Sequence, residues 1–244
     1  MQKSRLIEVL KSFNKKDFRD FRKFVRSPYF NQREDVVVLF DYLAEQLSLT
    51  KAKKLSKTVV FNKVFPEEKY NEKKISYTMS FLYNNIKEFL ANQEFMMNPL
   101  NKQLYLSKAL RKRGLNRQFE SEIKGAENIL EKSELRQMDF HYLDYCVHEE
   151  KYNYSISQSR QEAEQFQILT DKLTVFFIAN KLRHACASLS HKSLSEVQLK
   201  QDLLPEVLKH VETNDYTHLA DVSIYYHSYK ALTSSTSNAN FEQL

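Results

Sequence analysis

The chain has 244 residues, of which 42% are apolar and 13% aromatic, and it carries a net charge of +6. This apolar content is enough to build a packed core, and it excludes an intrinsically disordered segment. Only two glycines and four prolines occur, fewer than sheet proteins with many tight turns or enzymes with glycine-rich phosphate loops require. The composition therefore predicts an all-α protein.

The cysteines and the apolar runs bear on the compartment. Cys146 and Cys186 are forty residues apart and have no second pair, so we expect buried, reduced cysteines and no disulfide framework. No uninterrupted apolar run in the sequence approaches the roughly 20 residues that span a bilayer. The N-terminus carries frequent charges where a secretory leader has an apolar stretch. These features predict a cytoplasmic protein with no membrane partner.

Positive charge is concentrated in the first half of the chain. Residues 1–113 have 24 Lys and Arg against 12 Asp and Glu, whereas residues 114–244 have 13 against 19. A basic half next to an acidic half indicates binding of nucleic acid or of an acidic partner. A solvated, lysine-rich helical surface gives the same pattern, and the opposite charges also allow the two halves to attract each other.

Apolar residues at helical spacing predict a first helix over about 4–12 and a second that starts at Asn14. Asn14, with Asp17 three residues later, has the pattern of a capping box. The second helix is amphipathic, and its polar face is basic. We take four cations on this face as candidates for nucleic-acid contact: Arg19, Arg22, Lys23 and Arg26.

The stretch SPYFN ends this second helix, because proline disfavours helical geometry in the residue before it. Asn31, with Glu34 three residues later, repeats the capping pattern and predicts the start of a third helix. We expect Tyr29 and Phe30 to plug the corner between these helices. The alternative is an aromatic recognition site or a phosphorylation site at Ser27 or Tyr29. We favour the structural joint, because every residue of the stretch then has a local role.

A second break, FPEEKYN, separates a short helix at 59–65 from a long one at 71–94. This outline is also that of a helix-turn-helix DNA reader, but the turn has no glycine and no arginine-rich recognition face follows it. Pro99 then suits the first turn of a new helix. The sequence therefore predicts a basic N-terminal helical bundle at 1–97 and a helical-repeat domain at 98–244.

The second domain is expected to consist of antiparallel helix pairs. A helix at 104–113 stops at Gly114 and returns as a helix at 116–132. Further helices are expected at 134–155, 159–189, 195–212 and 216–233, the third of these kinked or split at Pro205. Three cations end the first helix and are further candidates for nucleic-acid contact, although the helix dipole also favours cations at this position: Arg111, Lys112 and Arg113.

Residues 103–131 resemble a tetratricopeptide repeat. The matching positions are the inter-helix glycine and the leucine, small and aromatic positions around it: Leu106, Ser107, Leu110, Gly114, Ile123 and Ala126. Three positions depart from the pattern of that family: Gln103, Phe119 and Glu131. The resemblance covers about an eighth of the chain and implies an α-solenoid whose groove binds a protein or peptide.

The chain ends with a helix near Thr233, a Ser/Thr/Asn linker, and four residues that suit a new helix capped by Asn240. Repeat arrays finish with a polar capping helix. We therefore expect the native chain to continue past Leu244, so that the sequence is a truncated helical-repeat protein.

One cluster suits metal binding or acid–base chemistry. His141, Asp144 and His148 fall on one helical face. The alternative, which we favour, is that they are surface polar residues and that Asp144 pairs with His148 one turn later. HEEKY at 148–152 lacks the second histidine of the helical metalloprotease motif, and no cofactor motif is present.

The expected function is that of a non-enzymatic interaction or scaffold protein that binds a protein or peptide through a helical-repeat surface. The alternative is a nucleic-acid-binding regulatory protein that uses the basic N-terminal half. A helical metalloenzyme built around His141 ranks last. No catalytic, cofactor-binding or metal-binding residue is assigned.

Overall fold

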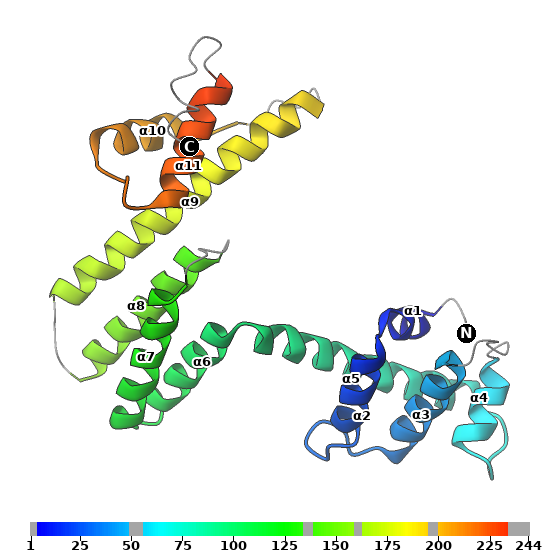
Figure 1. Ribbon diagram of the computed structural model, residues 1–244. Coiled ribbons are helices and arrows are strands. Elements are labelled where there is room, and N and C mark those ends of the chain that lie inside the picture. The colour runs from blue at the N-terminus through cyan, green and yellow to red at the C-terminus, as the bar shows by residue number, and fades with distance from the viewer. Residues whose placement is uncertain (1–3, 49–55, 134–138, 159–162, 195–199, 234–244) are drawn as a thin grey trace. The chain divides into compact units, whose positions relative to one another are not determined.

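The computed structural model describes residues 4–48, 56–133, 139–158, 163–194 and 200–233. These residues form eleven α-helices and no strand, which confirms the predicted all-α class (Figure 1). The chain divides into two compact units, Met1–Asn98 and Pro99–Leu244, which we call unit 1 and unit 2. Each unit is described by itself. The expected helix start at Asn240 lies outside the described residues.

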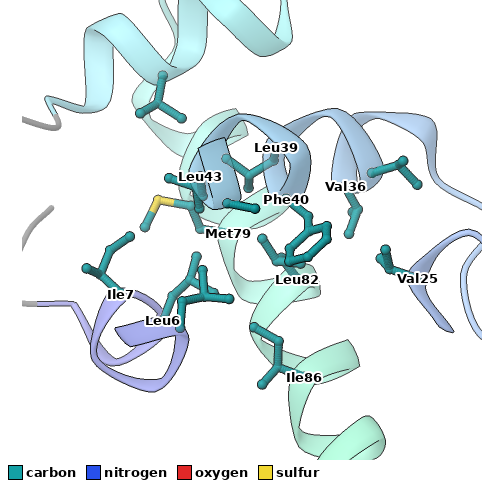
Figure 2. Close-up of a cluster of buried hydrophobic side chains, with 14 of the residues drawn as sticks. Leu6, Ile7, Val25, Val36, Leu39, Phe40, Leu43, Met79, Leu82 and Ile86 are labelled. Atoms are coloured by element: carbon teal, nitrogen blue, oxygen red, sulfur yellow. The ribbon is translucent and has the colours of Figure 1, made fainter. Parts of the chain in front are cut away.

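The described part of unit 1 contains α1 (Arg5–Ser12), α2 (Lys15–Val25), α3 (Glu34–Ser48), α4 (Lys57–Val64) and α5 (Glu72–Met97). The long helix α5 is the centre of the unit, because all four other helices pack against it. Figure 2 shows the core that results, in which side chains of α1, α3 and α5 meet: Leu6, Ile7, Val36, Leu39, Phe40, Leu43, Met79, Leu82 and Ile86.

Phenylalanine rings hold α2 in this core. The buried ring of Phe21 meets Phe40 of α3 edge-on at a centroid distance of 4.8 Å and Phe89 of α5 at 5.3 Å. Phe13, just after α1, meets Phe21 at 6.0 Å. Edge-to-face pairs of this kind are favourable beyond the area that they bury, so the apolar face of α2 fixes the helix and turns its opposite face to solvent.

The start of α2 forms as the sequence predicts. The Asn14 side chain accepts hydrogen bonds from the backbone N–H groups of Lys16 (2.8 Å) and Asp17 (3.0 Å), and the Asp17 carboxylate accepts one from the backbone N–H of Asn14 (3.0 Å). This is a complete capping box, in which the free amides of the first turn are satisfied.

The SPYFN turn joins α2 to α3. The backbone N–H groups of Phe30 and Asn31 both donate to the carbonyl of Ser27 at 3.0 Å. The buried Asn31 side chain donates to the carbonyls of Val25 (2.8 Å) and Arg33 (3.0 Å), and it accepts from the backbone N–H of Arg33 (3.1 Å). Asn31 therefore ties the turn together, and the capping contact expected between Asn31 and the third helix is replaced by these bonds.

The two aromatic residues of this turn behave differently. The ring of Phe30 stacks on Phe24 at a centroid distance of 3.9 Å, so Phe30 packs at the corner as expected. Tyr29 is 88% exposed and meets Phe30 edge-on at 4.9 Å. The expectation that Tyr29 plugs the corner is wrong, because of these two rings only that of Phe30 stacks on Phe24 and the Tyr29 side chain stays exposed.

The described part of unit 2 contains α6 (Pro99–Arg111), α7 (Asn116–Glu131), α8 (Phe140–Ser157), α9 (Ala163–Leu194), α10 (Leu204–Thr213) and α11 (Ala220–Thr233). Helix α6 packs on α7, and α8 packs on α9 and also on both helices of the preceding pair. Helices α10 and α11 pack on α9 (Figure 1). Two buried clusters form the core, one around Phe119 and Ile123 and the other around Leu182 and Val222.

The turn between α6 and α7 shows why a glycine is needed there. Gly114 has a φ of +68°, which L side chains rarely adopt. Its N–H donates to the carbonyl of Arg111 (2.9 Å), and the N–H of Leu115 donates to Leu110 (3.1 Å). These two bonds form a Schellman motif, which satisfies the last carbonyls of α6 and reverses the chain. The predicted stop at Gly114 is confirmed.

The structure corrects two details of the expected helices. Pro99 lies in the first turn of α6 as predicted, so this helix begins five residues before the start expected at 104. Pro205 does not kink a helix; it lies in the first turn of α10, directly after Leu203, which has a φ of 64°. The missing N–H of a proline costs nothing at this position. The expected helix starts at 134, 159 and 195 lie outside the described residues.

Candidate functional site

One stripe of α8 lines two pockets between α7 and α9. The stripe repeats every three or four residues and is largely polar: Phe140, Asp144, His148, Lys151, Ser155 and the helix-capping Gln158. The rise of an α-helix gives this stripe a length of about 27 Å. Both pockets also include Glu127 of α7. We call the two pockets and the stripe beneath them the α8 groove.

The first pocket, at the C-terminal end of α8, has a volume of about 360 Å³ and an apolar wall. Phe119 of α7 stacks on Tyr154 of α8 at a centroid distance of 4.2 Å, and the buried side chain of Ile123 lies on the same face of α7. The Tyr154 hydroxyl donates to the Glu120 carboxylate (2.9 Å). The side chain of Lys124 is exposed at the edge of this pocket. The pocket therefore offers an apolar surface within a polar rim.

The second pocket, near the N-terminal end of α8, has a volume of about 320 Å³ and is more polar. The buried Asp144 carboxylate lies 2.7 Å from Nζ of Lys172 on α9 and 3.1 Å from Nδ1 of His148. Nδ1 of His148 also lies 2.9 Å from the carbonyl of Asp144. Because both of these neighbours are acceptors, Nδ1 carries the hydrogen and donates.

Hydrogen bonds keep Asp144 charged in this pocket. Burial by itself raises the pKa of Asp144, but the hydrogen bonds from His148 and Lys172 outweigh burial and hold its pKa below the ordinary value. A second ion pair, from Nζ of Lys151 to Glu127 (2.6 Å), lies between the two pockets. The charged groups at this end of the groove thus pair with one another.

Two further polar contacts fix α8 from its other sides. Glu150 is buried and forms an ion pair with Arg111 of α6. His141 is buried and lies 2.5 Å from the Asp221 carboxylate of α11. Burial raises the pKa of Asp221, but the hydrogen bond and the electrostatic attraction from His141, together with hydrogen bonds from backbone N–H groups, outweigh this effect, and the pKa of Asp221 is lowered. Polar side chains of α8 therefore hold it to each of the helices around it.

The three residues considered for metal binding are not brought together. Asp144 pairs with His148 as predicted, but His141 contacts α11, and the expectation that all three lie on the surface is wrong because His141 and Asp144 are buried. Among the residues that the structure describes, no group of three or more His, Cys, Asp or Glu side chains is placed to hold a metal ion.

The candidates for nucleic-acid contact fall into two sets. Arg19, Arg22, Lys23 and Arg26 all lie exposed on α2 of unit 1. The other set ends α6 in unit 2, where Arg111 is held by Glu150, and the Arg113 guanidinium donates to the carbonyl of Ala109 (2.9 Å). Lys112 is exposed. Arg111 and Arg113 thus both have contacts within unit 2. These contacts agree with the interpretation that the cations stabilise the C-terminal end of α6.

Sequence reasoning missed the residues that line the α8 groove. Asp144 and His148 were noticed for their spacing. The contact between Asp144 and Lys172 was missed, because these residues are 28 positions apart in the sequence and lie on different helices. Phe119 appeared only as a departure from the tetratricopeptide pattern, although its large ring forms the apolar wall with Tyr154. The signal that was available is the composition of α8, whose polar residues fall on every face.

Comparison with family models, curated proteins and solved structures finds no match to this chain. A separate search of the described residues identifies no helix that is both long and apolar enough to cross a membrane.

Proposed function

We propose that the chain is a non-enzymatic interaction protein in which unit 2, a solenoid of antiparallel helix pairs, binds a peptide segment of a partner protein in the α8 groove. The observation that carries the proposal is the pocket beside Phe119 and Tyr154. Its volume of about 360 Å³ lies within the usual range for ligand sites, and it combines an apolar wall with a polar rim.

The stacking of the helices supports the solenoid part of the proposal. In a solenoid, each helix pair packs on the next, so that first helices of successive pairs contact each other. Helix α6 contacts α8 in this way, and α7 contacts α8. Such stacking leaves elongated grooves between neighbouring pairs.

The shape of the groove favours a peptide over a compact small molecule. Two pockets of similar volume lie along one helix, and the Lys151–Glu127 ion pair lies between them. A peptide can place an apolar anchor in the first pocket and polar groups over the second, as helical and extended peptides do in grooves.

Peptide selection against the full chain tests this function. Peptides enriched from a random displayed library are synthesised, and their affinities are measured for three proteins: the native chain, Gln158→Trp and Gln167→Trp. Gln158 is exposed at the mouth of the first pocket, whereas Gln167 is an exposed residue of α9 that lines neither pocket.

We expect Gln158→Trp to weaken binding at least tenfold, because the indole fills the mouth of the pocket, and Gln167→Trp to bind as the native chain does. Charge reversal at Lys124 is expected to change the affinity more than the same change at Lys102, an exposed lysine of α6 that lines neither pocket. Selected peptides that bind all these variants equally would place the binding surface elsewhere.

A further inference from the structure

The exposed face of α2 is a continuous line of positive charge. A helix turns by about 100° per residue, so six cations of α2 and its capping residue fall within roughly a third of the circumference. All six are exposed, while Phe21 and Val25 bury the opposite face. We call this set the basic stripe: Lys15, Lys16, Arg19, Arg22, Lys23 and Arg26.

Carboxylates neutralise the basic stripe only in part. Arg19 pairs with Asp20 (3.2 Å), and Arg22 and Arg26 share the single carboxylate of Asp41 at 3.1 and 2.5 Å. The three lysines of the stripe have no ion pair with any residue that the structure describes. The stripe and its two acidic partners therefore keep a net charge of +4, with the six cations spread over about 16 Å of the helix axis.

Tyr29 lies just beyond the end of this stripe. It lies three positions after Arg26, so their Cα atoms are at most about 11 Å apart. Its ring is 88% exposed, yet it rests edge-on against Phe30, which stacks on Phe24 in the wall of the core. The hydrogen bonds of Asn31 fix the same turn. An exposed aromatic side chain that is already held in place loses little entropy when it binds a ligand.

A hollow of about 550 Å³ adjoins the turn, and Arg26, Pro28 and Arg33 are among its lining residues. Unit 1 thus combines a line of cations, an exposed aromatic ring and a hollow with arginines at its edge. Sites for single-stranded nucleic acids pair these same features: cations follow the phosphates, and an aromatic ring stacks on a base.

We propose that unit 1 binds single-stranded nucleic acid, with phosphates along the basic stripe and a base stacked on Tyr29. A duplex hides the faces of its bases, so the ring favours a single strand. An acidic protein segment matches the charges but gives the ring no particular role. The proposed site uses none of the residues of the α8 groove, so it stands independently of the function proposed for unit 2.

Fluorescence anisotropy of the full chain tests the proposal. The probes are labelled single-stranded dodecamers of oligo-dT and oligo-U, together with a labelled duplex DNA of mixed sequence and the same length. Titrations run from about 50 to 200 mM salt, the range over which phosphate-driven binding falls steeply. Unlabelled poly-glutamate serves as the acidic competitor.

We expect the single strands to bind more tightly than the duplex. Tyr29→Ala should weaken single-strand binding roughly 5- to 100-fold without changing the salt slope, because one base loses its stacking partner. Tyr29→Phe should bind within about twofold of the native chain. Both changes leave the fold intact, since the ring is exposed, and circular dichroism checks this.

The triple change Lys15→Gln, Arg19→Gln and Lys23→Gln should reduce the salt slope by about 2, as expected for three lost phosphate contacts with a single strand. The matched control changes three exposed lysines of unit 1 outside the stripe to glutamine, at Lys63, Lys69 and Lys73, and should keep the native slope. Absence of binding at about 50 mM salt overturns the proposal. Equal affinity of Tyr29→Ala and the native chain, or displacement by poly-glutamate at equal charge, assigns the stripe to an acidic protein and also overturns it.

Discussion

Asp144 is a buried carboxylate that accepts hydrogen bonds from Lys172 and His148. Because these hydrogen bonds outweigh burial, the folded chain holds the pKa of Asp144 below its ordinary value. An aspartate in an unfolded chain has a pKa near 3.9. The contribution of Asp144 to stability is therefore complete above about pH 4 to 5 and is lost as the pH falls through the folded pKa.

Asp144→Asn tests this linkage. At pH 7 the change leaves Lys172 without its counter-charge, and we expect the free energy of unfolding to fall by about 1.5–3 kcal/mol. The difference from the native chain should shrink as the pH falls below about 4, where the aspartate of the unfolded chain takes up a proton, and should disappear below the lower pKa of the folded chain. Urea unfolding between pH 3 and 7 measures both effects.

Asp139→Asn is the matched control for this experiment, since Asp139 is exposed and its side chain makes no capping hydrogen bond to α8. It should behave like the native chain across the same pH range. A gap between native chain and Asp144→Asn that stays constant with pH would show that the carboxylate acts through packing and not through charge.

Single residues were predictable where their partners are close in sequence. Asn14 and Asp17 cap the same helix turn, and His148 lies one turn after Asp144, so spacing alone identifies both pairs. His141 was placed on the surface because its partner, Asp221, is 80 residues away. A contact of that range depends on how α11 packs, which helical periodicity does not encode.

At the scale of elements, the SPYFN turn depends on one side chain. Asn31 is buried and makes three hydrogen bonds to backbone groups of Val25 and Arg33. Without this side chain, these backbone groups at the junction between α2 and α3 lose their hydrogen-bond partner. A buried polar group without a partner destabilises the fold by about 1–3 kcal/mol.

Asn31→Ala should therefore lower the free energy of unfolding of the full chain by about 1–3 kcal/mol. Tyr29→Ala, in the same turn, should change it by less than about 0.5 kcal/mol, because an exposed ring contributes little to stability. Thermal and urea unfolding of the two variants measure this contrast. A larger loss for Tyr29→Ala would mean that the ring is part of the joint after all.

Helices were predictable where residues that stop or start them stand in the sequence. Gly114 follows the end of α6 and Asn71 precedes the start of α5, as expected. A positive φ and a side-chain cap both depend on residues that are close in sequence, so they can be recognised there. Pro205 misled, since a proline within an apolar pattern suits either a kink or a first turn. In the structure, Leu203 has a positive φ directly before α10, so the helix starts after Leu203 and Pro205 lies in its first turn.

At the scale of the whole molecule, the buried clusters are separate. The cluster of unit 1 is built from residues between Leu6 and Phe89, and both clusters of unit 2 are built from Leu100 onward. A unit with its own core can fold alone. We expect a fragment of residues 1–98 to be helical by circular dichroism and to unfold cooperatively on heating.

The control for this fragment ends at residue 80, within α5. It lacks Leu82, Ile86 and Phe89, three buried side chains of the unit 1 core. This shorter fragment should unfold without a cooperative transition. A non-cooperative transition for residues 1–98 would mean that unit 1 depends on unit 2 for its stability.

The overall class followed from composition, because so few glycines and so many apolar residues at helical spacing suit only helices. The α8 groove did not follow, since its walls come from α7 and α9 and its size depends on how closely these helices approach α8. Helix packing is set by the shapes of contacting side chains, which a single sequence does not reveal.

The central claim is that the α8 groove of unit 2 binds a peptide. The most direct test is amide chemical-shift mapping of the isotope-labelled full chain with a peptide selected against it. We predict that the largest shifts fall at residues 119–127, at residues 151–158 and at Gln165, around the pocket beside Phe119 and Tyr154. Shifts confined to unit 1, or to α10 and α11, would contradict the claim.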